Sequence, residues 1–355
     1  MEHPSAGDLA TGPVCPIPIS EYPAVLLAHG GGGKLSQHLV RKMFLPAFRN
    51  PLLEMLHDGA IVETGGTRLA FSTDSYVISP IFFPGGDIGS LAVHGTVNDL
   101  AMCGSRPLWL SAAFIIEEGL SMDTLWKVVS SMEGAARSAG VMIATGDTKV
   151  VDRGKGDGIF ITTAGIGVID PGIDIRPARV APGDRIILSG PIAEHGIAIL
   201  SVRQGIEFRT QLRSDSAPLH GLTSAMFATG SDIHTLRDPT RGGVASALNE
   251  IAETSGTGML IREDSIPLHD EVRGACEMLG LDPLYVANEG KLIAFVPAAQ
   301  ADAVLEAMRA HPLGSAACVI GEVVADHPSV VVMESTIGGK RVVDMLSGEQ
   351  LPRIC

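Results

Sequence analysis

The sequence predicts a protein of two domains, each built from mixed helices and strands in α/β or α+β layers. Three observations lead to this prediction. The chain has 355 residues, and one domain usually takes about 100–200 residues. Apolar patterns of both the helical and the strand type occur in each half. A turn-rich stretch from Pro171 to Pro182 separates the halves and is the expected domain boundary.

The first half contains three strand patterns and two helix patterns. In chain order they are a strand at Arg68–Ser79 that ends in Thr73-Asp74-Ser75, a helix at Ile88–Cys103, a helix at Ser121–Ala139, a short buried strand at Val141–Ala144 that precedes Thr145–Lys149, and a strand at Gly158–Thr163 that leads to Gly165–Val168. Ser121 is a suitable N-cap for the second helix, and Gly140 is a suitable stop. The Pro-rich residues 1–23 are expected to form a disordered tail.

The second half repeats this mixture. Strands are expected at Arg185–Ser189, Met259–Arg262, Lys291–Val296, Val319–Val324 and Ser329–Met333, and helices at Ala193–Gln204, Leu219–Ala228, Gly242–Ser255 and Ala301–Ala310. No short-period tandem repeat is found, which excludes a solenoid architecture.

Composition excludes several classes of partner. The net charge is −14 and aromatic residues make up 4%, so neither a phosphate-neutralising field nor a base-stacking platform for nucleic acid is evident. No apolar run approaches the ~20 residues of a membrane span, and Met1–Ser20 lacks the features of a secretory signal. We therefore expect a cytoplasmic protein without a membrane partner. A small anionic ligand fits if metal ions offset the acidity.

We expect the five cysteines to be reduced thiols, because none forms a CxxC pair and they are widely spaced along the chain. Cys103, Cys276 and Cys318 lie among apolar neighbours and are expected in the core. Cys15 has no expected role. Cys355 is the last residue, and a chain end is usually exposed and mobile. Such a thiol can be loaded in one place and presented in another, although by itself an accidental terminal cysteine explains it equally well.

Several acidic residues lie at strand ends and turns beside small residues. They are Asp74, Asp87, the pair Asn98-Asp99, Asp147 in Thr-Gly-Asp-Thr-Lys, and Asp238 in Arg-Asp-Pro-Thr-Arg-Gly-Gly. Carboxylate oxygens are ligands for Mg²⁺, and small neighbours admit a polyphosphate. For any single aspartate, ordinary turn or cap chemistry explains the pattern better. Five such positions together favour a metal site.

Three further motifs suit a phosphate or a proton transfer. In His29–Ser36, four glycines and Lys34 could bring backbone amides and a positive charge to phosphate oxygens. The segment is not a Walker loop, because Ala28 and Leu35 stand where that pattern requires Gly and Ser or Thr. A flexible linker explains the glycines equally well. Asp238–Gly243 precedes an apolar helix whose N-terminus suits a phosphate, unless it is only a cap. Glu289, in Asn-Glu-Gly-Lys before a strand, is either a general base or a solvated edge residue.

Taken together, these segments closely resemble the HypE family of carbamoyl dehydratases, which act in nickel–iron hydrogenase maturation. The resemblance runs from about Val25 to Cys355 and rests on Thr73–Ser75, Phe82–Gly89, Gly95–Met102, Gly146–Val151, Asp238–Gly243 and the end Pro352-Arg353-Ile354-Cys355. A motif at the very end of a chain is unusual, which makes the joint pattern specific.

The resemblance implies an α+β, PurM-like (AIR synthase-related) two-domain fold. An N-terminal domain over residues 24–172 would bind ATP and form a homodimer through its sheet. A C-terminal α/β domain would cover residues 173–348, and residues 349–355 would form a mobile tail that carries the terminal cysteine.

The resemblance also implies ATP and Mg²⁺ as cofactors and assigns site residues. Asp74, Asp99, Asp147 and Asp238 would hold the metal. ATP would be bound by Lys34, Gly31, Gly33, Asp74, Asn98, Thr148, Arg241 and Gly242. Cys355, Lys149 and Glu289 would be catalytic, and which of Lys149 and Glu289 is the base stays open.

The implied reaction dehydrates a carbamoyl group on Cys355 to a thiocyanate, which supplies the cyanide ligand of the hydrogenase iron. The carbamoyl oxygen is a poor leaving group until it is phosphorylated by ATP, after which a base takes the N–H protons. The implied partners are a HypF-type carbamoyltransferase and a HypC–HypD complex that carries the iron.

Two other classes of function remain as alternatives. A selenophosphate-synthetase-like enzyme would carry its reactive cysteine in the glycine-rich segment, where this chain has none, and a purine-type synthetase would not need a terminal cysteine. A non-catalytic nucleotide-binding scaffold would not need Lys149 and Glu289 beside a full set of acids.

Overall fold

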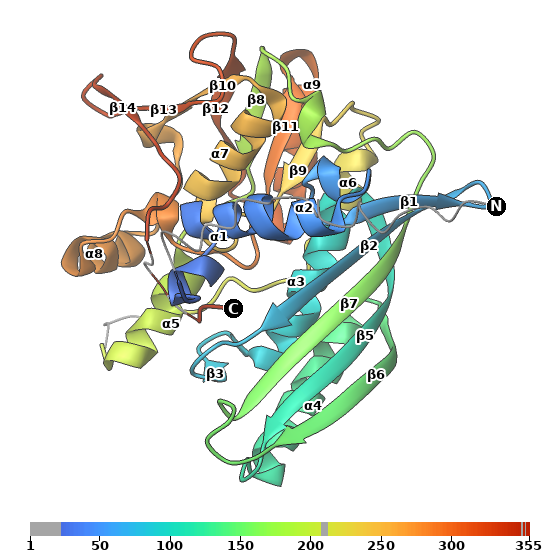
Figure 1. Ribbon diagram of the computed structural model, residues 1–355. Coiled ribbons are helices and arrows are strands. Elements are labelled where there is room, and N and C mark those ends of the chain that lie inside the picture. Colours follow the sequence, from blue (N-terminus) through green and yellow to red (C-terminus); the bar gives the residue numbers. More distant parts are fainter. Residues whose placement is uncertain (1–22, 207–211, 349–350, 352) are drawn as a thin grey trace, which may run out of the picture.

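The computed structural model describes residues 23–206, 212–348, 351 and 353–355 (Figure 1). The expected disordered tail lies almost entirely outside these residues, as do Cys15 and positions 349, 350 and 352 of the expected C-terminal tail.

The first half is a five-stranded sheet with two helices on one face (Figure 1). In spatial order the strands are β1 (Ala60–Thr64), β2 (Thr67–Tyr76), β7 (Ile159–Ile169), β5 (Ser105–Glu117) and β6 (Met142–Val151). α3 (Ile88–Met102) packs on β2, β7 and β5, and α4 (Met122–Ser138) packs on α3. The predicted helices are therefore confirmed, and Ser121 caps α4 by accepting a hydrogen bond from the Thr124 amide at 3.1 Å.

The edge strand β6 differs from the sequence prediction. The short buried strand expected at Val141–Ala144 is wrong, because β6 continues to Val151 and residues 142–150 are exposed. Among the described residues β6 pairs with β5 alone, and the exposure of residues 142–150 shows that neither face of the strand is buried. Gly146 permits this pairing, since a Cβ at that position would lie 2.1 Å from the Ala112 carbonyl oxygen.

The second half is a seven-stranded sheet covered on both faces. In spatial order its strands are β14 (Lys340–Val342), β13 (Val331–Glu334), β10 (Gly258–Arg262), β12 (Cys318–Val324), β8 (Asp184–Leu188), β11 (Ile293–Pro297) and β9 (Thr235–Arg237). Neighbouring strands run antiparallel except for β10 and β13.

Alternation along β8 and β11 sends side chains to two separate apolar cores. Ile186, Leu188 and Phe295 pack with α5 (Glu194–Gln204), α7 (Gly243–Ser255) and α8 (Asp270–Leu279). Ile187 and Ala294 pack with α6 (His220–Phe227) and α9 (Ala298–Ala310) on the opposite face. Cys103 and Cys276 are buried as expected, whereas Cys318 is only partly buried.

The two halves share a packed interface, and the end of the chain lies inside it. α1 (Lys34–Leu39), a π-helical turn (Val40–Phe44) and α2 (Leu45–Phe48) cross in front of this interface (Figure 1). Ile354 and Cys355 belong to the apolar core of the first half, together with Ile199 of α5. Among the residues that the structure describes, no helix is both long and apolar enough to cross a membrane.

Asp87 caps α3, and this role can be separated from metal binding. Its Oδ1 accepts hydrogen bonds from the amides of Gly89 at 2.7 Å and Ser90 at 3.3 Å. Asp87→Ala should lower the free energy of unfolding by about 1–2 kcal/mol, because loss of an N-cap leaves helix amides unsatisfied. Asp87→Ser, which can still cap, is the matched control in urea denaturation. A change in magnesium-dependent ATP binding with unchanged stability would contradict the capping role.

Candidate active site

A polar cavity of about 250 Å³ lies between the two halves. Residues from both halves and the last residue of the chain line it, namely His57, Asp58, Thr73, Asp74, Gly95, Asp99, Arg237, Asp238, Thr240, Arg241, Glu289 and Cys355. Six predicted site residues therefore come together here, namely Asp74, Asp99, Asp238, Arg241, Glu289 and Cys355. We call this cavity the cleft pocket.

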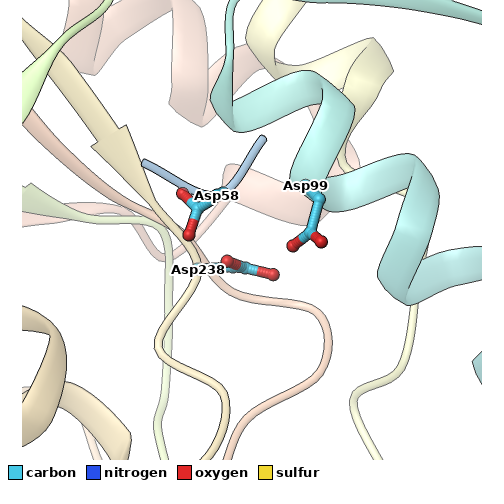
Figure 2. Close-up of side chains that lie close together, drawn as sticks. All are labelled: Asp58, Asp99 and Asp238. Carbon is cyan, nitrogen blue, oxygen red and sulfur yellow. The ribbon is translucent and has the colours of Figure 1, made fainter. Parts of the chain in front are cut away.

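Three carboxylates converge within the cleft pocket (Figure 2). Asp58 comes from the loop before β1, Asp99 from α3 and Asp238 from the segment after β9, and one oxygen of each lies within 4.8 Å of the others. Burial, followed by the charge of Asp58, raises the pKa of Asp238 to about 8. Burial and then the charge of Asp238 also raise the pKa of Asp99 well above its usual value. This clustering is unfavourable unless protons or a cation offset it.

The donor set of this cluster fits a magnesium ion. Asp58 Oδ2 is buried and has no hydrogen-bond partner among the described residues. Asp99 Oδ2 accepts a hydrogen bond from the Ser72 hydroxyl at 2.6 Å, and Asp58 Oδ1 pairs with Arg237 at 2.6 Å. Mg²⁺ takes hard oxygen ligands and usually one or two carboxylates together with substrate phosphates. Asp58, Asp99 and Asp238 would hold such an ion, and Asp74 lines the same pocket.

Asp147, Thr148 and Lys149 are not among the residues that line the cleft pocket. They lie on β6, three strands away from β2, which corresponds to roughly 14 Å at the usual strand spacing. Lys149 Nζ pairs with Asp147 at 2.6 Å, and both side chains are exposed. Their predicted roles in metal binding, ATP binding and catalysis stay predictions.

Glu289 lies at the pocket because the backbone around it is hydrogen-bonded to Asp215. Burial raises its pKa well above the usual value, with further contributions from Asp238 and Asp74. Its Oε1 is buried without a hydrogen-bond partner in the described part of the chain. The amides of Glu289 and Gly290 donate to the Asp215 carboxylate at 3.1 and 3.3 Å. Gly290 is required because a Cβ there would lie 1.8 Å from the Asp215 carbonyl oxygen.

The Asp215 carboxylate and Asn98 support this arrangement from outside the pocket. Lys291 Nζ pairs with Asp215 at 3.1 Å, which offsets the buried charge of the carboxylate. Asn98 uses its side-chain amide to join α3 to the second half, and its predicted role in ATP binding stays a prediction. It donates to the carbonyls of Ala217 and Glu289 and accepts from the Leu219 amide. In this structure Asn98 is a link between the halves.

The glycine-rich segment contacts the start of α7. A Cβ at Gly32 would lie 2.6 Å from the Arg241 carbonyl oxygen, and Arg241 Nη1 donates to the Gly30 carbonyl at 3.2 Å. Gly242 adopts a φ of +76° directly before α7. Gly31 and Gly33 continue this segment, but Lys34 turns away and pairs with Asp344 at 2.5 Å. The segment thus covers one side of Arg241, while Lys34 is not among the residues lining the cleft pocket.

Cys355 is buried in the cleft pocket with 8% of its surface exposed. Burial raises the pKa of its thiol to about 12, with Arg241 opposing and Glu289 and Asp74 adding to the rise. The Val77 amide donates to the main-chain carboxylate oxygen of Cys355 at 3.0 Å. The exposed chain end that we expected is thus seated inside the protein in this conformation, and its mobility stays a prediction.

Sequence reasoning missed two charged residues of the pocket. Asp58 occurs in His-Asp-Gly, an ordinary turn pattern, and offers no signal that separates it from other turn aspartates. Arg237 directly precedes the recognised Asp238 and pairs with both Asp58 and Glu250. The one available sequence signal for Arg237 was that it is the first residue of the Arg-Asp-Pro-Thr-Arg-Gly-Gly motif.

Both halves match models of known domain families. Residues 56–169 match the N-terminal domain of AIR synthase related proteins, and residues 181–334 match the C-terminal domain. The chain is thus an AIR synthase related protein with the PurM-like two-domain fold. A thiamine-monophosphate kinase from Aquifex aeolicus, 16% identical with a TM-score of 0.64, shares this fold.

Closer relatives define the family. The carbamoyl dehydratase HypE of Azotobacter vinelandii is 56% identical over 94% of this chain and 97% of its own. A solved HypE–HypF complex aligns with a TM-score of 0.83 at 45% identity, over 87% of this chain and 99% of the other. A HypE structure in complex with ATP aligns with a TM-score of 0.79 at 51% identity, over 94% and 100%. The chain belongs to the HypE family.

The raised pKa values of Asp99 and Asp238 give a pH-dependent expectation. In the metal-free protein the pKa of Asp238 is about 8 against 3.8 unfolded, so the folded state binds more protons between these values. The free energy of unfolding should therefore fall as pH rises through this window. Because Mg²⁺ replaces those protons, it should raise the thermal midpoint more at about pH 8.5 than at about pH 6.

The control for this experiment is Asp238→Asn, which removes the ionisable carboxyl group. It should weaken both the fall in the free energy of unfolding with rising pH and the pH dependence of the magnesium effect. Thermal unfolding with and without magnesium chloride measures them. An equal magnesium effect at both pH values would contradict a metal site built on these carboxylates.

Proposed function

We propose that this protein is an ATP-dependent carbamoyl dehydratase that converts a carbamoyl group on Cys355 to a thiocyanate for nickel–iron hydrogenase maturation. The observation that carries the proposal is the position of the terminal thiol. It lies in one cavity with three magnesium-compatible carboxylates, a buried glutamate and Arg241. Relatives named carbamoyl dehydratase and a relative solved with ATP support the reaction class.

The chemistry requires that the carbamoyl oxygen become a leaving group. In S–C(=O)–NH₂ this oxygen attacks the γ-phosphorus of ATP, and ADP leaves. Asp58, Asp99 and Asp238 would hold the Mg²⁺ that offsets the phosphate charge. Arg241 lines the same cavity and can stabilise the negative charge that develops there. Phosphorylation of the oxygen makes the nitrogen acidic, so that it gives up its first proton to leave S–C(OPO₃)=NH. Removal of the second nitrogen proton with departure of phosphate then leaves S–C≡N.

Glu289 is the group best placed to receive protons from the carbamoyl nitrogen. It lines the same cavity as Cys355, and its Oε1 has no other hydrogen-bond partner among the described residues. Burial raises its pKa, so its carboxylate is a stronger base toward the nitrogen protons than an exposed glutamate would be. The geometry within one chain favours Glu289 over Lys149 for the base.

Loading and dehydration require two positions of the tail. The thiolate is the nucleophile that accepts a carbamoyl group, and a docked thiol with a pKa of about 12 is almost entirely protonated at neutral pH. Cys355 would therefore be loaded outside the pocket and would dock as the neutral thiocarbamate. A HypF-type carbamoyltransferase would load it, as the solved complex of a HypE relative with HypF supports. A HypC–HypD complex that carries iron would accept the cyanide.

A homodimer through the first sheet completes the proposal. The face opposite α3 exposes a row of neighbouring apolar side chains across four strands, formed by Phe71, Ile166, Trp109 and Met142. Such a patch is typical of an interface. Pairing of two sheets would also cover β6, so Asp147, Thr148 and Lys149 would act beside a second copy of the chain.

Cys355→Ala tests the carrier directly. The variant should bind ATP but accept no carbamoyl group, whereas Cys318→Ala, which removes a partly buried thiol elsewhere, should accept one. Intact mass after incubation with a carbamoyl-donating partner measures this. In the unsubstituted protein, the adduct should lose one water only when ATP is added. Carbamoylation of Cys355→Ala would contradict the assignment.

Glu289→Gln tests the base. The variant keeps the size of the side chain and should accept the carbamoyl group normally, but its dehydration rate should fall by about 10²–10⁴-fold, the usual contribution of a general base. Single-turnover mass spectrometry with the preloaded tail and ATP measures the rate. An unchanged rate would remove Glu289 from the mechanism, and the same assay on Lys149→Ala would then test the other candidate.

A further inference from the structure

The C-terminal segment is fastened by its backbone. The Val77 amide donates to the main-chain carboxylate oxygen of Cys355 at 3.0 Å, and the Ser79 amide donates to the Arg353 carbonyl at 3.3 Å. The segment therefore pairs like a short strand beyond the end of β2. Arg203 of α5 also donates to the Arg353 carbonyl. Between these points the Ile354 side chain is 3% exposed and packs in the core. The Arg353 side chain adds two contacts, because its Nε donates to the Val77 carbonyl at 3.3 Å and its guanidinium pairs with Asp157.

The remaining backbone carbonyl, that of Ile354, is bound by a buried histidine. His195 lies on α5 with no exposed surface. Its Nε2 lies 2.8 Å from the Ile354 carbonyl oxygen, and its Nδ1 lies 2.8 Å from the Ser214 hydroxyl. Burial lowers the pKa of His195, although Asp215 and the bond to Ile354 oppose this, so the ring is neutral at neutral pH.

These contacts determine which ring nitrogen carries the proton. A carbonyl oxygen only accepts hydrogen bonds, so Nε2 must be the donor and Nδ1 must be bare. The Ser214 hydroxyl therefore donates to Nδ1. The Ser216 amide in turn donates to the Ser214 oxygen at 3.1 Å, which orients the hydroxyl. Ser214 thus holds His195 in the tautomer that can bind the tail.

The same short segment also fixes the expected base. Ser214 is anchored by its amide, which donates to the Pro84 carbonyl at 2.8 Å. The next residue, Asp215, accepts the amides of Glu289 and Gly290. The residue that orients the tail anchor and the residue that holds Glu289 are therefore adjacent in the chain. A tail seated on His195 is placed in a defined position relative to Glu289.

We propose that His195, oriented by Ser214, is a positioning residue that holds the terminal segment in the cleft pocket and sets the fraction of time that Cys355 spends there. Its purpose in catalysis rests on the proposed function, but the docking itself does not. His195 binds the backbone of Ile354 and does not touch the reacting group.

Thiol labelling of the resting protein tests this role without ATP or a carbamoyl donor. A docked Cys355 is buried and protonated, so a neutral maleimide should react mainly with the undocked tail. His195→Phe keeps a ring against Phe83, whose centroid lies 5.6 Å away, but removes the donor. Labelling of Cys355, located by peptide mass, should become roughly tenfold faster, because about 1.4 kcal/mol of a buried hydrogen bond is lost.

Two variants separate positioning from general loosening. His195→Gln can still donate an N–H to the Ile354 carbonyl and should restore slow labelling. His220→Phe alters a histidine of α6 whose Nδ1 has no hydrogen-bond partner among the described residues, and it should label at the unsubstituted rate. Unchanged labelling of a folded His195→Phe, or an equal acceleration in His220→Phe, would overturn the proposal.

Ser214→Ala keeps the test decisive if His195→Phe does not fold. It leaves the imidazole in place but removes the hydroxyl that selects the tautomer, so labelling should rise by roughly threefold. An unchanged rate in this variant would equally overturn the proposal. Failure of the proposed function would appear differently, as a protein that labels as expected but never dehydrates a loaded carbamoyl group.

Discussion

The rest of the structure depends on one constraint, which is the burial of several carboxylates in the cleft between the two halves. Asp58, Asp99 and Asp238 lie within reach of one ion, and Glu289 is buried in the same cavity. Arg237 and Arg241 offset part of this charge, and the raised pKa values of Asp99 and Asp238 show that the remainder is unbalanced in the protein alone. A cation together with a phosphate-bearing substrate would complete such a site, because each supplies the charge that the other requires.

The same constraint bears on the proposed role of Cys355 as the carrier thiol. Inside the cleft, burial and the neighbouring carboxylates suppress the thiolate of Cys355, so the site suits a neutral thiocarbamate better than a nucleophile. A terminal residue can leave and return without opening the fold. Backbone contacts from Val77, Ser79 and His195 make its docked position specific. In the proposed reaction, the cleft would serve the dehydration step, and loading of the thiol would take place outside it.

Much of this arrangement could be predicted from the sequence, and the failures have physical causes. The helices α3 and α4 and most strands of the second half follow from local periodicity and caps. Asp74, Asp99, Asp238 and Glu289 were recognised because short motifs surround them, whereas Asp58 stands in an ordinary turn. The exposure of β6 could not be predicted because it depends on which strands pair with it. The buried position of Cys355 depends on contacts with residues more than 150 positions away, which no local pattern encodes.

The most direct test of this account measures the distance between the tail and the acid cluster in the loaded protein. The carbamoyl group on Cys355 is labelled with carbon-13, Mn²⁺ replaces Mg²⁺, and a non-hydrolysable ATP analogue holds the complex before reaction. The account requires a large manganese-dependent increase in the relaxation of the carbamoyl carbon, which is lost in Asp238→Asn. Relaxation that stays unchanged while Mn²⁺ is bound would show that the carrier and the metal do not meet, and would contradict the account.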